Sequence, residues 1–333
     1  MIGSIIAVVR TNGPAVLGRA TLLLALAAWG GAISPFLDGL NHFAPIWLAV
    51  SLAGVLACWL AGSRGWAVYC AIATLAQAVI IAPEFMRTNA PLAATPTAER
   101  TVRIVWLNTW LGSRPSEDVL HYLETSEADF LLVSEMHDEG QASFRRLRAT
   151  YPTVIRCEDG RACNTIIFAK REALSVQTQT GLRATAGDFD IDGAQLRLIA
   201  AHVARPNPPG RQQRELDALL DVIGSDQASV ILAGDFNSTP WSFTLRRFDG
   251  ASELQRHTRA LPTWPAQEWT RLRLPALTPF LPIDHVYSGA HWRLVSVRRG
   301  PRTSSDHFPL EATFQSRRSE QTSAVGNRRE RAE

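Results

Sequence analysis

Three long apolar stretches near the N-terminus constrain the fold of this 333-residue chain more than any other feature. They run over residues 20–37, 43–62 and 66–83, and charged residues are nearly absent from this part of the chain. Each stretch is close to the roughly 20 residues that a helix needs to cross a bilayer. Four tryptophans lie near their ends, as interfacial anchors do: Trp29, Trp47, Trp59 and Trp66. The sequence therefore predicts a transmembrane region of three helical spans over residues 1–86.

Two alternatives to membrane spans are buried helices of a soluble protein, and a signal peptide followed by two core helices. Three successive uncharged stretches flanked by tryptophans disfavour the first alternative. No small-residue cleavage site ends a short first segment, which disfavours the second.

The basic residues predict the orientation of the spans. Arg10 and Arg19 precede the first span and Arg64 separates the last two, whereas residues 38–42 contain no Lys or Arg. Cytoplasmic loops carry the excess of basic residues, so the N-terminus is expected in the cytoplasm of a multi-pass inner-membrane protein. Everything after the third span would then be extracytoplasmic, in the periplasm of a bacterium with two membranes.

A globular region is predicted to follow the spans. Residues 87–100 are rich in Ala, Pro and Thr and indicate an extended linker. Residues 101–315 form the globular part, and residues 316–333 are polar and charged and indicate a disordered tail.

Inside the globular part, apolar strands first alternate with amphipathic helices and then predominate. We expect strands over 102–108, 129–135, 164–170, 174–179, 228–237, 282–289 and 291–300, a hairpin over 189–203, and helices over 115–127, 139–151 and 211–223. This order favours an α/β sandwich of two sheets with helices outside and with strand-end loops gathered along one edge.

Polar residues lie at or near the ends of these apolar runs. They are Asn108, Glu135, His202, Asp235, Asn237, Asp284, Asp306 and His307. Taken singly, each has a structural explanation: Asn108 as a turn cap, Glu135 as a solvated acid, His202 as a core histidine with a satisfied ring nitrogen. The functional interpretation therefore depends on the complete set.

In chain order the set lies in the motifs LN, SE, AHV, GDFN, IDHVY and SSDHFPL, and it resembles the endonuclease/exonuclease/phosphatase superfamily. The resemblance covers residues 101–314 and excludes the apolar N-terminal region. The resemblance and the predicted membrane spans together suggest a membrane-anchored bacterial member of the superfamily. It implies a four-layered α/β sandwich that cleaves a phosphate ester with a divalent metal, with Mg²⁺ as the expected cofactor and Mn²⁺ as its substitute. The superfamily shares this reaction and not a single substrate.

The resemblance and the chemistry of phosphate esters together suggest the metal ligands. Hard oxygen ligands suit Mg²⁺, which takes only one or two carboxylates. Glu135 with Asn108 is the best candidate pair, and Asp306 would complete a contact to metal or water. The resemblance also pairs Asp284 with His307, so that the carboxylate orients the imidazole and raises its pKa.

The remaining residues of the set would act on water and phosphate. Asp235 and Asn237 lie two positions apart on an extended segment and point to the same side. By resemblance Asp235 is the general base or acid, Asn237 a ligand of the phosphate or the transition state, and His202 a second phosphate donor. Arg205 and Asn164 are additional candidates for substrate binding.

Several neighbouring residues have less specific interpretations. Many relatives have Gln where this chain has Ser134, and Thr where it has Ala201, but no catalytic position is lost. Arg211 is expected either to bind phosphate or to lie in a solvated loop. His285, beside Asp284, is expected on the opposite face of its strand.

The tripeptide Gly-Asp-Phe occurs twice, and only its second copy belongs to the motifs above. In the first copy the acids Asp188, Asp190 and Asp192 have the spacing of a calcium loop, but an EF-hand would need a bidentate Glu at the position of Ile199. The Asp192-Gly193 pair predicts a hairpin turn instead.

The four cysteines form two pairs. Cys58 and Cys70 lie inside predicted spans, where they behave as small apolar residues. Cys157 and Cys163 flank a short loop and are expected to form a disulfide outside the cytoplasm.

Two functional hypotheses follow: a membrane-tethered phosphoesterase, and a non-catalytic binding domain that kept the fold. The substrate of the enzyme would be a lipid headgroup, a nucleic acid or a small phosphate ester, and no obligate protein partner is indicated. A basic, aromatic loop with Trp264, Trp269, Arg271 and Arg273 is suited either to a nucleic acid or to the bilayer.

Overall fold

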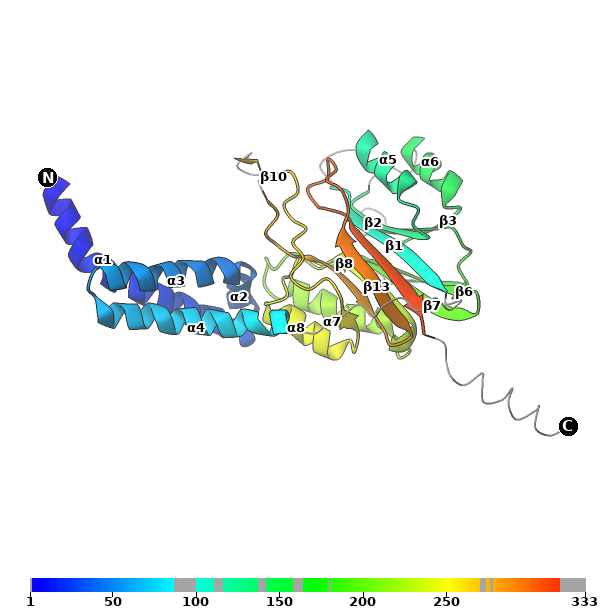
Figure 1. Cartoon of the computed structure of the whole chain (residues 1–333). Helices are drawn as coiled ribbons and strands as arrows, with labels where there is room; N and C mark the ends of the chain where they lie inside the picture. The colour runs from blue at the N-terminus through cyan, green and yellow to red at the C-terminus, as the bar shows by residue number, and fades with distance from the viewer. Residues whose placement is uncertain are drawn as a thin grey trace.

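A bundle of apolar helices and a two-sheet sandwich make up the protein (Figure 1). The structure is a computed structural model, and it describes residues 2–86, 100–110, 116–136, 142–157, 164–179, 181–269, 274–275 and 278–317. The predicted linker up to residue 99 and the predicted tail from residue 318 lie outside these residues, as do Cys163, Arg271 and Arg273.

The bundle consists of the long helices α1 (Ile2–Trp29), α3 (Ala44–Leu60) and α4 (Arg64–Met86). Three short elements join α1 to α3 at the end nearest the sandwich (Figure 1): the 3-10 helix η1 (Gly30–Ala32), α2 (Pro35–Asp38) and the 3-10 helix η2 (Gly39–Phe43). Among the described residues, three segments are long and apolar enough to cross a membrane: Asn12–Ala32, Pro35–Leu60 and Arg64–Met86. The protein therefore has the helices of a membrane-anchored chain.

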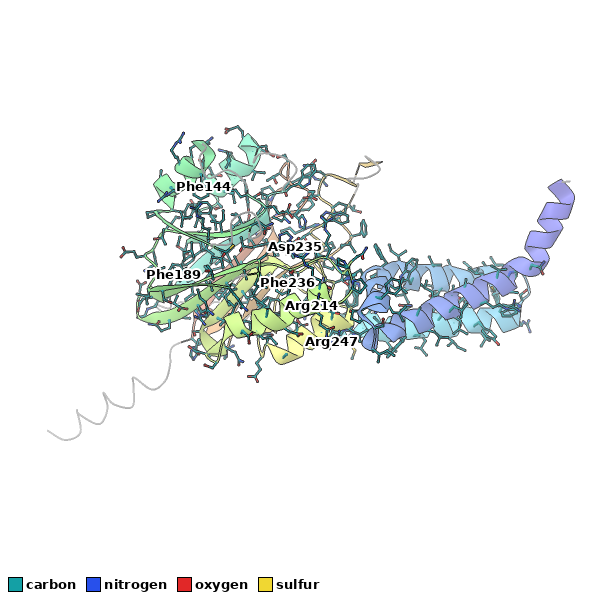
Figure 2. All side chains as sticks on the ribbon, turned by 180° about the vertical axis from the view of Figure 1, so that it is seen from behind. Phe144, Phe189, Arg214, Asp235, Phe236 and Arg247 are labelled. Atoms are coloured by element: carbon teal, nitrogen blue, oxygen red, sulfur yellow. The ribbon has the colours of Figure 1, made fainter. Side chains whose placement is uncertain are left out.

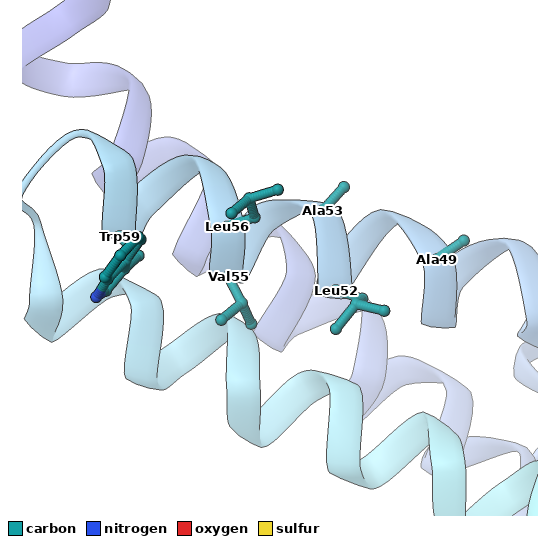
Figure 3. A pocket seen from close by; sticks show the side chains of 6 residues that line it. All are labelled: Ala49, Leu52, Ala53, Val55, Leu56 and Trp59. Atoms are coloured by element: carbon teal, nitrogen blue, oxygen red, sulfur yellow. The ribbon is translucent and has the colours of Figure 1, made fainter.

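Helix α3 shows how this bundle faces its surroundings. It presents a groove of about 540 Å³ lined by Ala49, Leu52, Ala53, Val55, Leu56 and Trp59 (Figure 3). Leu52, Leu56 and Trp59 are each more than half exposed. Exposed apolar side chains along a whole helix are unfavourable in water and suit lipid tails.

Two six-stranded mixed sheets follow. The first has the order β13-β14-β1-β2-β4-β3, and the second the order β5-β6-β7-β8-β12-β9. The strands of the first sheet are β1 (Thr101–Asn108), β2 (Phe130–Ser134), β3 (Thr153–Arg156), β4 (Thr165–Ala169), β13 (Trp292–Arg299) and β14 (Leu310–Ser316). Those of the second are β5 (Ser175–Thr178), β6 (Ala184–Ile191), β7 (Ala194–His202), β8 (Val230–Asp235), β9 (Gln255–Arg256) and β12 (Asp284–Ser288). A short hairpin of β10 (Glu268–Trp269) and β11 (Leu274–Pro275) lies apart from both.

Helices cover the outer face of each sheet. Helices α5 (Glu117–Thr125) and α6 (Ala142–Thr150) lie on the first sheet, and α7 (Arg211–Ile223) and α8 (Phe243–Ala251) on the second (Figure 1). Phe189 lies in the core between the sheets, whereas Phe144 packs in the core under α5 and α6 (Figure 2). These four layers confirm the predicted architecture.

The first Gly-Asp-Phe segment is part of a hairpin, as predicted. Asp192 and Gly193 join β6 to β7, with φ angles of 54° and 91°. Asp188 pairs with Arg197 at 2.9 Å and Asp192 with Arg171 at 3.0 Å. The acids of this segment therefore serve a turn and two ion pairs of the hairpin.

Cys157 is disulfide-bonded, whereas Cys58 and Cys70 are free and buried in the bundle. The predicted partner Cys163 lies outside the described residues, so the Cys157–Cys163 pairing stays a prediction.

We expect alkylation of the denatured, unreduced chain to label Cys58 and Cys70 and to leave Cys157 unmodified. Peptide mass spectrometry checks this result, with a reduced sample as the control in which all four cysteines react. Labelling of Cys157 without reductant would contradict the disulfide.

Candidate active site

Strand ends bring the predicted polar residues together at one edge of the sandwich. Strands β1 and β2 run parallel and end together, with Asn108 opposite Ser134 and Glu135 next in the chain. Strands β7 and β8 also run parallel and place His202 opposite Asp235. Asp284 begins β12 opposite Asp235. The segment before β14 adds Asp306 and His307 to the same edge, where His307 pairs with Asp284.

Gly234 explains why a glycine precedes Asp235. A Cβ atom at this position would lie 2.3 Å from the carbonyl oxygen of Ala201 on the neighbouring strand. No side chain fits at that distance, so glycine permits the close approach of β8 to β7. Asp235 follows at the strand end and is 2% exposed.

Asp284 and His307 form the predicted pair. His307 Nδ1 lies 2.8 Å from Asp284 Oδ2, and both residues are buried. Burial by itself lowers the pKa of His307, but the charge and hydrogen bond of Asp284, helped by the charges of Asp235 and Asp306, raise it to about 10. His307 is therefore an imidazolium at neutral pH.

Two further side chains hold Asp284, and both were missed in the sequence. Trp106 Nε1 donates to Oδ1 at 2.8 Å, and Thr263 Oγ1 donates to Oδ2 at 2.5 Å. Burial raises the pKa of Asp284, but the charge and hydrogen bond of His307 and these two donors outweigh it and lower the pKa. Trp106 could have been found, because it lies two residues before Asn108 on β1 and so faces the same side.

Asp235 lies at the centre of the edge. Its Oδ2 is 3.2 Å from Asn108 Nδ2 and 3.8 Å from the Nε2 atoms of both His202 and His307. Burial and the charge of Asp284 raise its pKa to about 7, against the opposing charge of His307. A carboxyl group with this pKa can both accept and donate a proton near neutral pH.

Asn237 continues the chain beyond Asp235. Its backbone N–H donates to Asp235 Oδ1 at 2.8 Å, and its Nδ2 donates to the Val203 carbonyl at 3.0 Å. Its φ of 46°, like the φ of 59° at Glu135, lies in the left-handed region that non-glycine residues rarely adopt. Such backbone strain is concentrated at functional sites.

Oxygen ligands for a cation lie beside Asp235. Glu135 Oε1 is 3.2 Å from Asn108 Nδ2 and 3.5 Å from His202 Nε2. Asp306 accepts a hydrogen bond from Trp264 Nε1 at 3.2 Å. The pKa of Asp306 is raised mainly by its burial and also by the nearby charge of Glu135. A divalent cation would relieve the repulsion between these carboxylates, so the residues present fit a hard metal ion.

A second group has the spacing of a metal site. Single ligand atoms of Asp235, Asp284 and His307 lie within 4.8 Å of one another. However, both oxygens of Asp284 already accept hydrogen bonds, and the pKa of His307 is raised by Asp284, which favours its protonated form. This group therefore fits proton transfer better than cation binding.

His202 and Asn164 extend the site. His202 Nδ1 lies 3.1 Å from Asn164 Oδ1. Burial, followed by the charges of Arg183, His307 and Arg205, lowers the pKa of His202 well below its ordinary value. His202 is therefore a neutral hydrogen-bonding group, unlike His307.

The structure separates three other residues from this cluster. Arg205 is exposed and affects His202 only through its charge. Arg211 Nε pairs with Glu215 Oε1 at 2.9 Å on helix α7. His285 bonds to Thr258 Oγ1 and the Ser238 carbonyl at 2.9 and 2.8 Å, which confirms the predicted opposite face.

Trp264 and Ser305 are positioning residues whose roles the sequence did not reveal. Trp264 was expected to contact a nucleic acid or the bilayer, but its indole N–H holds Asp306. Ser305 Oγ donates to the Asn108 carbonyl at 2.6 Å and accepts from the His307 N–H at 3.0 Å. These bonds tie the loop that carries Asp306 and His307 to the end of β1.

Comparison with known proteins agrees with this architecture. A model of the Endonuclease/Exonuclease/phosphatase family matches residues 105–307, which include every residue of the central cluster. No curated protein matches the chain.

Solved structures of this fold are similar to the sandwich at low sequence identity. D. rerio TDP2 complexed with a single strand DNA product is 16% identical, with a TM-score of 0.51, over 64% of this chain and 98% of that one. The human Nocturnin catalytic domain with a bound sulfate anion is 16% identical, with a TM-score of 0.50, over 71% and 99%. A family protein from Bacteroides thetaiotaomicron is 12% identical, with a TM-score of 0.50, over 67% and 100%. At these identities the likeness shows the fold alone.

Proposed function

Because the chain belongs to the endonuclease/exonuclease/phosphatase family, we propose that it is a membrane-anchored phosphoesterase that uses a divalent metal, Mg²⁺ or its substitute Mn²⁺. It hydrolyses a phosphodiester or a phosphomonoester by attack of water. In this proposal residues 1–86 anchor the protein in the membrane, and residues 87–100 link the anchor to the catalytic domain. Residues 101–315 form the catalytic domain, and residues 316–333 form a tail.

One observation carries the proposal: the buried carboxyl group of Asp235 lies between two buried histidines, His307, which is paired with Asp284, and His202, which is paired with Asn164. The Asp235 Oδ2 atom is 3.8 Å from the Nε2 atoms of both His307 and His202. A pure binding domain has no need for a buried imidazolium beside a carboxyl group that titrates near neutral pH, and burying charges is costly. Perturbed pKa values of this kind are concentrated at catalytic sites.

Each residue has a defined task in the proposed reaction. A divalent cation held by Asn108, Glu135 and Asp306 would supply positive charge to a phosphoryl oxygen. Asp235 takes the proton of the attacking water, and the His307 imidazolium, held by Asp284, hydrogen-bonds the negative phosphoryl group. The P–O bond to the ester oxygen breaks as the water oxygen bonds to phosphorus, and the leaving oxygen takes a proton from solvent.

Amide and imidazole groups complete the contacts to phosphate. Neutral His202 has a single ring N–H, so we assign it as a phosphate donor in the tautomer that carries this proton on Nε2, with Nδ1 accepting from the Asn164 amide. One Nδ2 hydrogen of Asn237 bonds to Val203, so the second hydrogen remains for a phosphoryl oxygen. Asn164, which pairs with His202, and Arg205, whose charge reaches His202 from the exposed surface, are assigned to the rest of the substrate.

Two observations support an orientation for the protein. The end of the bundle that carries the Lys- and Arg-free segment 38–42 is the end that meets the sandwich (Figure 1). Cys157 is disulfide-bonded, as is common outside the cytoplasm. We therefore propose a cytoplasmic N-terminus and an extracytoplasmic, periplasmic catalytic domain in the inner membrane.

The metal ligands make a specific prediction. Glu135→Gln removes one anionic oxygen and should raise the Mg²⁺ concentration for half-maximal hydrolysis about tenfold or more, in line with the loss of a metal-site residue. The assay uses the detergent-solubilised full chain with bis-aryl phosphate, a nucleic acid and a phospholipid as substrates. Asp192→Asn in the exposed hairpin is the matched control. Hydrolysis that is insensitive to EDTA, or absent for every ester, would contradict the proposed function and favour a non-catalytic binding domain.

A further inference from the structure

A buried ion pair joins the membrane bundle to the sandwich. Glu84, in the last turn of α4, accepts from Arg256 at 2.9 and 2.8 Å, and the two residues are only 4% and 2% exposed. Arg256 also pairs with Asp249 of helix α8 at 3.0 Å. The two parallel hydrogen bonds of a bidentate pair fix its geometry. Separating the pair would leave a buried charge without its partner, which is costly. The contact therefore fixes the two parts relative to each other.

A second set of contacts holds helix α8 against the bundle, and we call the two sets together the seat. The carboxylate of Asp38, from the turn between the first two spans, accepts from the backbone N–H groups of Phe243 and Thr244, each at 2.8 Å. These are donors that the first turn of a helix leaves unsatisfied. Trp241 donates to the His42 carbonyl at 3.2 Å and packs with apolar residues of α1, α3 and α4.

This seat lies near the end of the third candidate membrane span, Arg64–Met86. Arg246 of α8 donates to the carbonyl of Ile80, which is 16 residues after Arg64 at the start of α4. At 1.5 Å per residue this is about 24 Å along the helix, and the hydrocarbon core is about 30 Å thick. Ile33 and Phe36, at the same end of the bundle, are 91% and 73% exposed. In a membrane, these exposed apolar side chains would contact lipid tails, which would hold the sandwich near the bilayer surface.

The catalytic edge begins at this seat. Thr239, four residues after Asp235, contacts His42 Nδ1 through its backbone N–H and its hydroxyl group, each at 3.3 Å. Four residues span at most about 14 Å, so Asp235 lies within that distance of the contact with the membrane segment. In Figure 2, Asp235 lies in the half of the sandwich that faces the bundle, and Arg247 lies at the junction.

From this placement, and resting on the proposed function, we propose that the substrate is a phosphate ester of a membrane lipid whose apolar tail stays in the outer leaflet. The interfacial layer adds about 5 to 8 Å on each side of the hydrocarbon core, which brings lipid phosphates close to the catalytic edge. A rigid seat at this height gives no advantage for a freely diffusing ester. For a substrate confined to the same membrane it raises the effective concentration.

The test compares the same headgroups in and out of a membrane. The full chain is reconstituted in vesicles that contain long-chain phosphatidylglycerol, phosphatidylethanolamine and phosphatidic acid. It is then assayed against soluble short-chain forms of these lipids, against bis-aryl phosphate and against single-stranded DNA. We expect at least one long-chain lipid to be hydrolysed tenfold faster than its short-chain form at equal bulk concentration. Equal rates, or faster hydrolysis of DNA than of every lipid, would overturn the inference.

A variant of the seat separates this inference from the proposed function. Glu84→Gln should lower lipid hydrolysis at least tenfold and change bis-aryl phosphate hydrolysis less than threefold; Glu127→Gln, on the exposed surface, is the matched control. Asp38→Asn is the second variant of the seat and is tested in parallel. Retained lipid hydrolysis in either variant, once it is shown to be folded, would overturn the inference. Absence of metal-dependent bis-aryl phosphate hydrolysis by the wild type would overturn the proposed function itself.

Discussion

Asp235→Asn is expected to lower kcat by about 10³-fold, within the range for removal of a general acid or base. The amide keeps the size and the hydrogen-bonding reach of the carboxyl group, but it cannot exchange a proton. Asp235 is the residue of the cluster that contacts both histidines and Asn108. Substrate binding depends on other groups, so KM should change much less than kcat.

Steady-state hydrolysis of bis-aryl phosphate at saturating Mg²⁺ measures this effect. Asp190→Asn is an appropriate control, because Asp190 follows the first Gly-Asp-Phe segment, in the hairpin, and does not lie at the catalytic edge. A kcat within threefold of the wild-type value for Asp235→Asn would show that the proton passes through another group.

Asp284→Asn should also lower kcat strongly, by about 10³-fold, and should change the pH profile. In the wild type the pKa of His307 is about 10, so the imidazolium persists well above neutral pH. Without the Asp284 charge, burial dominates and lowers the pKa of His307. The imidazolium form, and with it the activity, should then be lost at a lower pH as the pH rises.

The pH dependence of kcat/KM for the two proteins checks this prediction. The alkaline limb should move to lower pH in Asp284→Asn, and its activity should recover partly as the pH is lowered. Thr263→Val removes one hydrogen bond to Asp284 but keeps the charge, so its alkaline limb should move less. An unchanged alkaline limb in Asp284→Asn would mean that His307 is not the titrating group.

Much of the fold could be predicted because its signals are local. Strands such as β8 are continuous apolar runs that end in polar residues, and α7 has regular apolar spacing. Helix α8 was not predicted. It is nine residues long and contains Gly250, which lowers its helix propensity. It is stabilised by tertiary contacts that the sequence does not display.

The candidate site was predictable in part for the same reason. Strand ends indicated Asn108, Glu135, His202, Asp235 and Asp284, since polar residues interrupt apolar runs there. The two residues that hold Asp284 are distant from it in the chain, Trp106 by 178 residues and Thr263 by 21, and nothing in the sequence links them to it. The hydrogen bonds of Asp38 to the first turn of α8 join positions about 200 residues apart, so no local sequence pattern predicts them.

The most direct test of the central claim is reversible metal removal. The full chain is assayed for hydrolysis of bis-aryl phosphate in Mg²⁺, after EDTA, and after Mg²⁺ is restored, with Asp235→Asn treated in parallel. The account predicts hydrolysis that EDTA abolishes and Mg²⁺ restores in the wild type, and a rate about 10³-fold lower in Asp235→Asn. Equal rates with and without metal, or equal rates for the two proteins, would contradict it.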